Sequence, residues 1–140
     1  DVIEAIVYLH TFTPPVLLRN LKSHNVLISA EMQAKLTDIG ATRSLPDSGS
    51  EVGMHRWLAP ELISGRRYHS QPADIFAFGV LLSEFDMHNR PYDDALNNDG
   101  SQLDDLAILQ QVASGNLRPT FSDTCPPIVL ELAKQCMAQE

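Results

Sequence analysis

The segment between Ser70 and His88 most constrains what this chain can fold into. Ser70 can cap a helix that has Pro72 in its first turn. The apolar side chains that follow lie on nearly all sides of that helix: Ile75, Phe76, Phe78, Val80, Leu81, Leu82 and Phe85. A helix that is apolar on all sides has to be buried. The sequence therefore predicts a central helix that the rest of the chain covers.

A short β-hairpin is predicted in the first third of the chain. One apolar strand is Val26-Leu27-Ile28, a second covers residues 34–37, and residues 29–33 form the turn. Polar residues flank the hairpin: the string Leu18-Arg19-Asn20-Leu21-Lys22-Ser23-His24-Asn25 precedes it, and Asp38-Ile39-Gly40 follows it. The hairpin sets the spacing of thirteen residues from Asn25 to Asp38.

Three further helices are predicted from apolar spacing and capping residues. The chain begins inside one of them, over residues 1–10, without a preceding cap signal. A second covers residues 102–114, with Ser101 and Asp104 as a capping pair. The last is opened by Thr124 and the two prolines after it, and its apolar face consists of Ile128, Val129, Leu132, Ala133, Cys136 and Met137.

The composition is that of one globular domain and narrows the choice of partners. With 140 residues, of which 44% are hydrophobic and 20% charged, the chain can bury a single core. Its net charge of −8 argues against nucleic acid and anionic membranes, because phosphates need clustered Lys and Arg. The longest apolar run, Ile75 to Leu82, is far shorter than the ~20 residues of a membrane span, and no signal peptide opens the chain. A soluble, cytoplasmic protein is expected.

Neither the cysteines nor the histidines form a recognisable site. Cys125 and Cys136 lack a C-x-x-C spacing, so free thiols are expected. The five histidines are dispersed along the chain, and no metal site is expected among them.

Four motifs follow one another in an informative order. The string from Leu18 to Asn25 resembles the catalytic loop H-R-D-L-x-x-x-N of protein kinases, and Asp38-Ile39-Gly40 resembles their D-F-G triplet. Ala59-Pro60-Glu61 matches A-P-E, and residues 73–79 resemble the D-x-W-x-x-G helix. Four motifs in the right order form a much stronger signal than any one alone. The chain resembles the protein kinase superfamily from end to end. Two further strings, Trp57 before Leu-Ala-Pro-Glu and Tyr8-Leu9-His10, resemble its tyrosine-kinase-like Ser/Thr branch.

The resemblance implies a mainly α fold with a small β-hairpin, the large lobe of a protein kinase, truncated at both ends. Residues 1–140 would then form the C-lobe portion only, because no G-x-G-x-x-G loop of the N-lobe occurs and the last C-lobe helix is absent. A large lobe normally buries an apolar surface against the small lobe. We therefore expect a protein partner or the missing N-lobe to cover that surface.

The resemblance also assigns ATP and Mg²⁺ chemistry to several residues. Asn25 and Asp38 match the two metal-binding positions, and amide and carboxylate oxygens both suit Mg²⁺. Lys22 matches the lysine that neutralises the transferred phosphate, and Leu27 matches the apolar residue beneath the adenine ring. A solvated lysine and a core leucine are equally good interpretations of these two. Half of the family's ATP contacts come from the N-lobe, so weak binding is expected of this chain alone.

The catalytic position itself is changed. Asn20 stands where the family has its catalytic aspartate, and an amide can accept a hydrogen bond but cannot take the proton. Loss of a positioned general base typically costs about 10²- to 10⁴-fold in rate. Met54 removes a hydroxyl from the same network. The sequence favours a catalytically impaired, pseudokinase-like fragment that acts through protein binding. The alternative is a Ser/Thr protein kinase that transfers the ATP γ-phosphate to protein hydroxyls, with its N-lobe outside this chain.

The remaining motif residues have structural or regulatory roles by resemblance. Leu18 and Ile39 replace the His and the Phe of an apolar stack and remain apolar. Arg19 matches an arginine that, in many kinases, holds a phosphate on the activation segment. The candidate acceptors are Thr42, Ser44, Ser48 and Ser50, although such residues are usually just solvated. The other motif positions in this group are Gly40, Trp57 and Glu61.

Asp74 matches an aspartate that fixes the catalytic loop on the central helix. It lies near the start of a helix that is apolar on almost every face, and a buried carboxylate has to find hydrogen-bond donors. We predict that Asp74 is buried and accepts hydrogen bonds from the backbone around Leu18 and Arg19.

Overall fold

The computed structural model describes residues 1–40, 55–65 and 69–138. Within these ranges the chain is mainly helical and has one two-stranded antiparallel sheet, which confirms the predicted class. In chain order the elements are helix α1 (Val2–His10), 3₁₀ helix η1 (Ser23–Asn25), strands β1 (Val26–Ile28) and β2 (Ala34–Leu36), and helices α2 (Pro60–Ile63), α3 (Gln71–Met87), α4 (Asp105–Ala113) and α5 (Pro127–Cys136).

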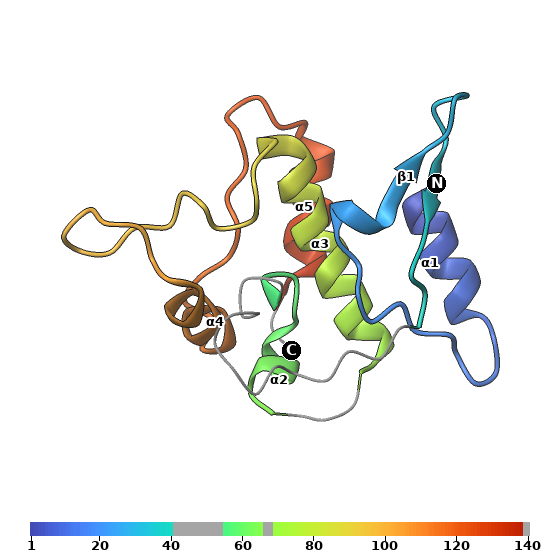
Figure 1. Cartoon of the computed structure of the whole chain (residues 1–140), viewed down its shortest axis with the longest axis horizontal. Helices are drawn as coiled ribbons and strands as arrows, with labels where there is room; N and C mark the ends of the chain where they lie inside the picture. The colour runs from blue at the N-terminus through green and yellow to red at the C-terminus, as the bar shows by residue number, and fades with distance from the viewer. Residues whose placement is uncertain (41–54, 66–68, 139–140) are drawn as a thin grey trace.

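Helix α3 is the central element, as its apolar composition predicts. It runs through the middle of the molecule, with α1 and the hairpin on one side and α4 on the other (Figure 1). Ten of its 17 residues are buried, among them Val80 and Leu81 without any exposed surface. Phe85 is the exception at 43% exposed, because it lies on the side that no other element covers in the described part of the chain. Two carboxylates, Asp74 and Glu84, are also among the buried residues of this helix.

Strands β1 and β2 form the predicted hairpin. Val26 lies opposite Leu36 in the antiparallel register. The second strand ends one residue earlier than expected, at Leu36, but the Thr37 N–H still donates to the Asn25 carbonyl oxygen at 3.0 Å. This bond closes the base of the hairpin, so the polar segments on either side of it meet there.

Helix α4 begins three residues later than the capping pair predicts. Asp104 is its N-cap, and the Asp104 carboxylate accepts a hydrogen bond of 2.7 Å from a backbone N–H in the first turn. Ser101 does not cap the helix; it donates its hydroxyl to the Asp99 carboxylate at 2.6 Å. Gln102 pairs with Leu96 in a single antiparallel bridge. The residues between these two form a tight turn in place of the predicted start of the helix, because short polar side chains stabilise turns as readily as helix ends.

The predicted last helix is present as α5, but its cap and its buried side differ from the prediction. Pro126 occupies the N-cap position, and the Thr124 hydroxyl pairs with a neighbouring serine. Ala133 and Met137 of the expected apolar face are buried, whereas Ile128 is 80% exposed. The C-terminal turns of α5 cross α3 closely, and its first turn is left in solvent.

Gly79 is the residue that lets α3 and α5 approach so closely. A Cβ atom added at Gly79 would lie 2.7 Å from Cγ of Met137, 3.0 Å from Cβ of Cys136 and 3.1 Å from the Ala133 carbonyl oxygen. Contacts below about 3 Å are not tolerated without movement, and the carbonyl belongs to the backbone of α5. The crossing of the two helices therefore depends on the absence of a side chain at this position.

We predict that Gly79→Ala destabilises the fold by about 1–3 kcal/mol. Alanine improves helix propensity by ~1 kcal/mol over glycine, but overpacking of a tight crossing costs more than this gain. Urea denaturation followed by circular dichroism measures the difference. Lys134→Ala, at an exposed position of α5, is the control and should change stability by less than about 0.5 kcal/mol. A Gly79→Ala protein as stable as the parent would contradict the close crossing.

Candidate active site

Asp74 joins the central helix to the loop that carries the motif residues. Its side chain is buried, with 2% of the residue exposed. Its Oδ2 accepts from the Leu18 N–H at 2.9 Å and its Oδ1 from the Arg19 N–H at 3.0 Å, which is the contact predicted from the sequence. His10 of α1 contributes a third contact, with Nε2 2.9 Å from Oδ2. Arg19 has a φ of +65°, an uncommon conformation for a residue with a side chain, and this bend aims two successive amides at one carboxylate.

Glu84 makes a second connection between α3 and the same loop. It is 9% exposed, and its carboxylate accepts from the backbone N–H of Ser23 at 3.2 Å and from the Ser23 hydroxyl at 2.5 Å. The indole Nε1 of Trp57 donates to the same carboxylate at 3.0 Å. The buried carboxylate therefore ties three segments together: η1, the segment before α2, and α3.

The spacing of these two carboxylates determines the path of the loop. Asp74 and Glu84 are ten residues apart, which corresponds to about 15 Å along a helix axis. Leu18 and Ser23 are five residues apart, and five residues span at most about 17 Å. The loop therefore has to run along α3 to reach both. Lys22, at φ −164° and ψ 165°, has an extended conformation.

Asn20, Asn25 and Asp38 come together at the base of the hairpin. The Asn20 Nδ2 donates to the Asp38 Oδ2 at 2.9 Å, and the Asn25 Nδ2 donates to the Asn20 carbonyl oxygen at 2.7 Å. Asp38 is exposed and has a φ of +58°, which turns its side chain back over the loop. The cluster offers amide and carboxylate oxygens, the ligand types that Mg²⁺ prefers. It lacks a carboxylate at position 20 that could accept a proton.

The other residues that are assigned by resemblance differ in how far they are exposed to solvent. Lys22 is half-buried, while Leu27 on β1 is 54% exposed and Ile39 is 45% exposed. Leu18, by contrast, is buried at 3%. The Gly40 N–H donates to the Leu18 carbonyl oxygen at 3.4 Å, which joins the segment after the hairpin to the loop before it. Met54 and the candidate phosphate acceptors at positions 42, 44, 48 and 50 lie outside the described residues.

Arg56 fixes the segment in front of α2 against the other side of the molecule. It is buried, and its guanidinium donates to the Asp105 carboxylate at 2.7 Å, to the Asp93 carboxylate at 2.6 Å and to the Pro91 carbonyl oxygen at 2.7 Å. Two carboxylates and one carbonyl oxygen hold the buried guanidinium in this position. Glu61 lies half-buried in the short helix that follows.

His69 is the titratable group next to the loop whose pKa is shifted. Burial lowers the pKa of His69, the positive charge of Arg19 lowers it further, and the negative charge of Asp74 opposes both. The usual pKa of histidine is 6.5, so the unfolded chain takes up this proton at higher pH than the folded protein does. His69 therefore leaves stability intact above pH 6.5 and reduces it as the pH falls below that value.

The sequence patterns do not predict the contacts of three residues in this arrangement: His10, Arg56 and Glu84. Glu84 left a signal, because it is one of only two carboxylates among the buried residues of an apolar helix. Cys125 and Cys136 are free thiols. In residues 1–40, 55–65 and 69–138 no cluster of His, Cys, Asp and Glu is arranged to hold a metal ion, and no helix is both long and apolar enough to cross a bilayer.

Comparisons with known proteins match the whole chain to one family. The family model described as the protein kinase domain matches residues 1–140. Cyclic GMP-binding protein C of Dictyostelium discoideum is 32% identical over 100% of this chain and 5% of that protein. Probable serine/threonine-protein kinase drkB of the same organism is 29% identical over 98% of this chain and 19% of its own length. Serine/threonine/tyrosine-protein kinase HT1 of Arabidopsis thaliana is 28% identical over 99% of this chain and 34% of its own length. The chain thus spans between 5% and 34% of the length of these relatives.

We predict that Asp74→Ala destabilises the fold by about 2–4 kcal/mol, because it leaves two buried amides without an acceptor and detaches the loop. Urea denaturation gives the loss of stability. Hydrogen exchange gives its location, since the Leu18 and Arg19 amides should lose protection. Asp123→Ala, at an exposed position, is the control and should leave both unchanged. Retained protection of the two amides in Asp74→Ala would mean that the carboxylate does not hold the loop.

Proposed function

Because the chain belongs to the protein kinase family, we propose that it forms the large-lobe part of a kinase domain, that phosphoryl transfer by it is impaired, and that it acts through protein binding. The observation that carries this proposal is the hydrogen bond from the Asn20 Nδ2 to the Asp38 Oδ2. The tyrosine-kinase-like branch is part of the same proposal, on the strength of Trp57 in front of Leu-Ala-Pro-Glu.

The contact between Asn20 and Asp38 explains why the site favours an inactive state. An amide donor stabilises the Asp38 carboxylate without any cation. An aspartate at position 20, with its oxygen 2.9 Å from that of Asp38, would repel it unless a proton or a metal ion lay between them. The contact between Asn20 and Asp38 is therefore stable without a cation, whereas two aspartates at these positions would need one. It gives up the proton acceptor that transfer to a hydroxyl requires.

The residues that remain fit a magnesium nucleotide in part. Asn25 uses its Nδ2 to bond the Asn20 carbonyl oxygen, which leaves its Oδ1 in position to act as a ligand beside Asp38. We assign these two to Mg²⁺, Lys22 to the transferred phosphate and Leu27 to the adenine ring. The bound ion would neutralise the phosphates. The 54% exposure of Leu27 supports an open, weakly gripping site.

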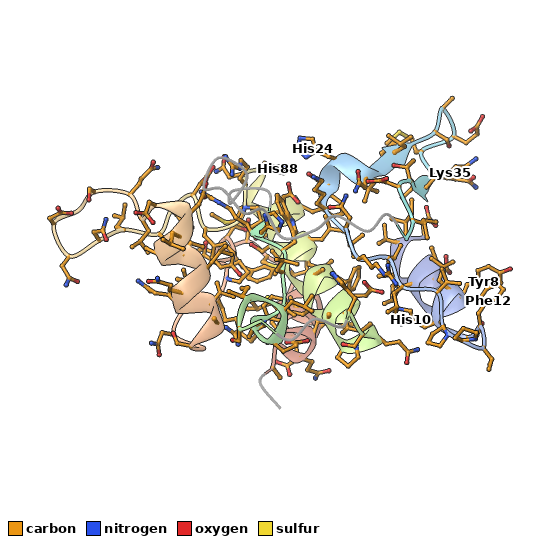
Figure 2. The ribbon with its side chains drawn as sticks, turned by 60° about the horizontal axis from the view of Figure 1, so that its bottom comes forward. Tyr8, His10, Phe12, His24, Lys35 and His88 are labelled. Carbon is orange, nitrogen blue, oxygen red and sulfur yellow. The ribbon has the colours of Figure 1, made fainter. Side chains whose placement is uncertain are left out.

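Protein binding is supported by apolar side chains that stand in solvent. On α1 and just after it the exposed ones are Ile3, Val7, Tyr8 and Phe12, and on the hairpin they are Leu27, Ile28 and Met32. Tyr8 and Phe12 stack edge to face, with ring centroids 5.1 Å apart. They lie on the side of α1 away from the rest of the molecule, while His10 lies toward α3 (Figure 2). Exposed apolar surface of this kind marks an interaction site. We assign it to a partner protein or a kinase N-lobe.

A second candidate function is favoured by the retained residues and by the names of the relatives. Asn25, Asp38 and Lys22 keep the residue types of an active site, and relatives such as drkB are described as probable serine/threonine-protein kinases. In this alternative the chain is part of a Ser/Thr kinase that transfers the ATP γ-phosphate to protein hydroxyls. Asn20 would then act by orienting the hydroxyl only.

We predict that the 140-residue chain does not transfer phosphate from ATP to a generic protein substrate, and that Asn20→Asp alone does not restore transfer. The reason is the combined lack of a base and of a phosphate-gripping lobe. Incorporation of radioactive phosphate is the measurement, with heat-killed protein as the blank. Transfer above the blank that Asp38→Ala abolishes and Asp123→Ala spares would establish the alternative function.

We also predict that millimolar Mg-ATP hardly changes the melting temperature of the chain. A ligand stabilises a protein only when its concentration exceeds its dissociation constant, and the described site offers few contacts to a nucleotide. Differential scanning fluorimetry with and without Mg-ATP measures the shift. Saturable stabilisation at micromolar ATP, lost in Asp38→Ala, would show that the large lobe suffices for binding.

A further inference from the structure

A cavity of about 330 Å³ lies at the C-terminal end of α3, where His88 is labelled in Figure 2. Its walls come from the last turns of α3, from the loop that follows, and from two distant residues, Gln102 and Thr120. This volume is at the low end of those that bind ligands and suits a single extended side chain better than a nucleotide. The cavity lies apart from the cluster of Asn20, Asn25 and Asp38, none of which lines it.

The walls combine apolar and acidic side chains. Met87 provides apolar surface, whereas Pro91 is fully buried behind it. Tyr92 is buried, and burial raises the pKa of its phenol, so this part of the wall carries no charge. Asp93 and Asp94 provide two carboxylates next to each other. A cavity lined by a methionine and by carboxylates is complementary to a long aliphatic side chain with a cationic head.

Asp94 is the carboxylate with capacity to bind such a head. Asp93 already pairs with the guanidinium of Arg56 at 2.6 Å, and Arg90, which also lines the cavity, has interactions of its own. Asp94 is exposed, and Thr120 donates to its Oδ2 at 2.6 Å. A carboxylate can accept about four hydrogen bonds, so a single hydroxyl leaves room for a guanidinium or an ammonium group. Thr120 also fixes the orientation of the carboxylate.

The surroundings of the cavity reinforce its preference for a cation. Residues 84–105 carry seven of the 18 carboxylates of the chain and only one of its ten basic residues. This part of the molecule comprises the last turn of α3 and the loop that leads from it to α4, on one side of α3 (Figure 1). A field of one sign attracts ligands of the other sign and repels anions such as phosphate. An anionic or purely apolar occupant therefore fits less well than a basic one.

We propose that this cavity is a docking site for an arginine or lysine side chain presented by a partner protein. The aliphatic stem lies against Met87, and the cationic head binds the Asp94 carboxylate. The inference holds whether or not the catalytic loop transfers phosphate, because the cavity shares no residue with that site.

The test is a nuclear magnetic resonance titration of the 140-residue chain with the peptide acetyl-Gly-Arg-Gly-amide. The expected result is saturable shifts at millimolar peptide, localised to the backbone amides of residues 89–94 and of Gln102. The same peptide with citrulline, which has nearly the shape of arginine but no charge, should bind at least about fivefold more weakly, since hydrogen bonds to charged groups are the stronger ones.

Two variants separate docking in the cavity from attraction by the overall negative charge. Asp94→Asn should weaken arginine-peptide binding about tenfold, because it removes the charged acceptor. Asp123→Asn removes the same charge from an exposed residue that does not line the cavity and should change binding less than about twofold. Equal effects of the two variants, equal binding of the citrulline peptide, or shifts outside the cavity would each overturn the proposal.

Discussion

The buried carboxylate of Asp74 is the interaction on which the rest of the site depends. An unpaired carboxylate inside an apolar helix bundle would cost several kcal/mol, and so would two buried amides without acceptors. Asp74 satisfies both by accepting from Leu18 and Arg19. His10 adds a contact from α1, so a single carboxylate joins the first helix, the loop and the central helix. The uncommon backbone conformation of Arg19 is stabilised by these bonds.

This anchoring uses main-chain N–H groups, which every residue type except proline provides. The shape of the loop is therefore independent of the chemistry of its side chains. Asp74 holds the start of the loop and Glu84 holds Ser23, so the path between them is fixed whatever side chain stands at position 20. Asn20 can therefore replace an aspartate without loss of the architecture. The side chain at this position affects only what the loop can bind or deprotonate. Fold resemblance alone says little about activity in such a chain.

Local patterns in the sequence predict the features that depend on local physics. The apolar run of α3 predicts its burial, the two short strands predict the hairpin, and an aspartate near the start of a mostly apolar helix predicts a buried acceptor. Features that depend on distant contacts do not appear in any local pattern. Trp57 and Ser23 meet at Glu84 only because the fold brings three segments together. The start of α4 was misplaced by a capping signal at Ser101 that belongs to a competing turn, since both structures use the same polar side chains.

The two sides of α3 differ in chemistry, and this difference bears on how a protein of this kind can bind others. Between Val2 and Val16 the chain has a single carboxylate, Glu4, and exposes several large apolar side chains. Residues 84–105, toward the other side, are strongly acidic. An apolar partner surface and a basic one would therefore bind at separate places without competition. Both places are attached to the same rigid helix, α1 through the bond of His10 to Asp74 and the acidic loop through direct continuation of the chain. A helix that is buried along most of its length is held rigidly by its packing. Helix α3 therefore fixes the distance and orientation between the two surfaces.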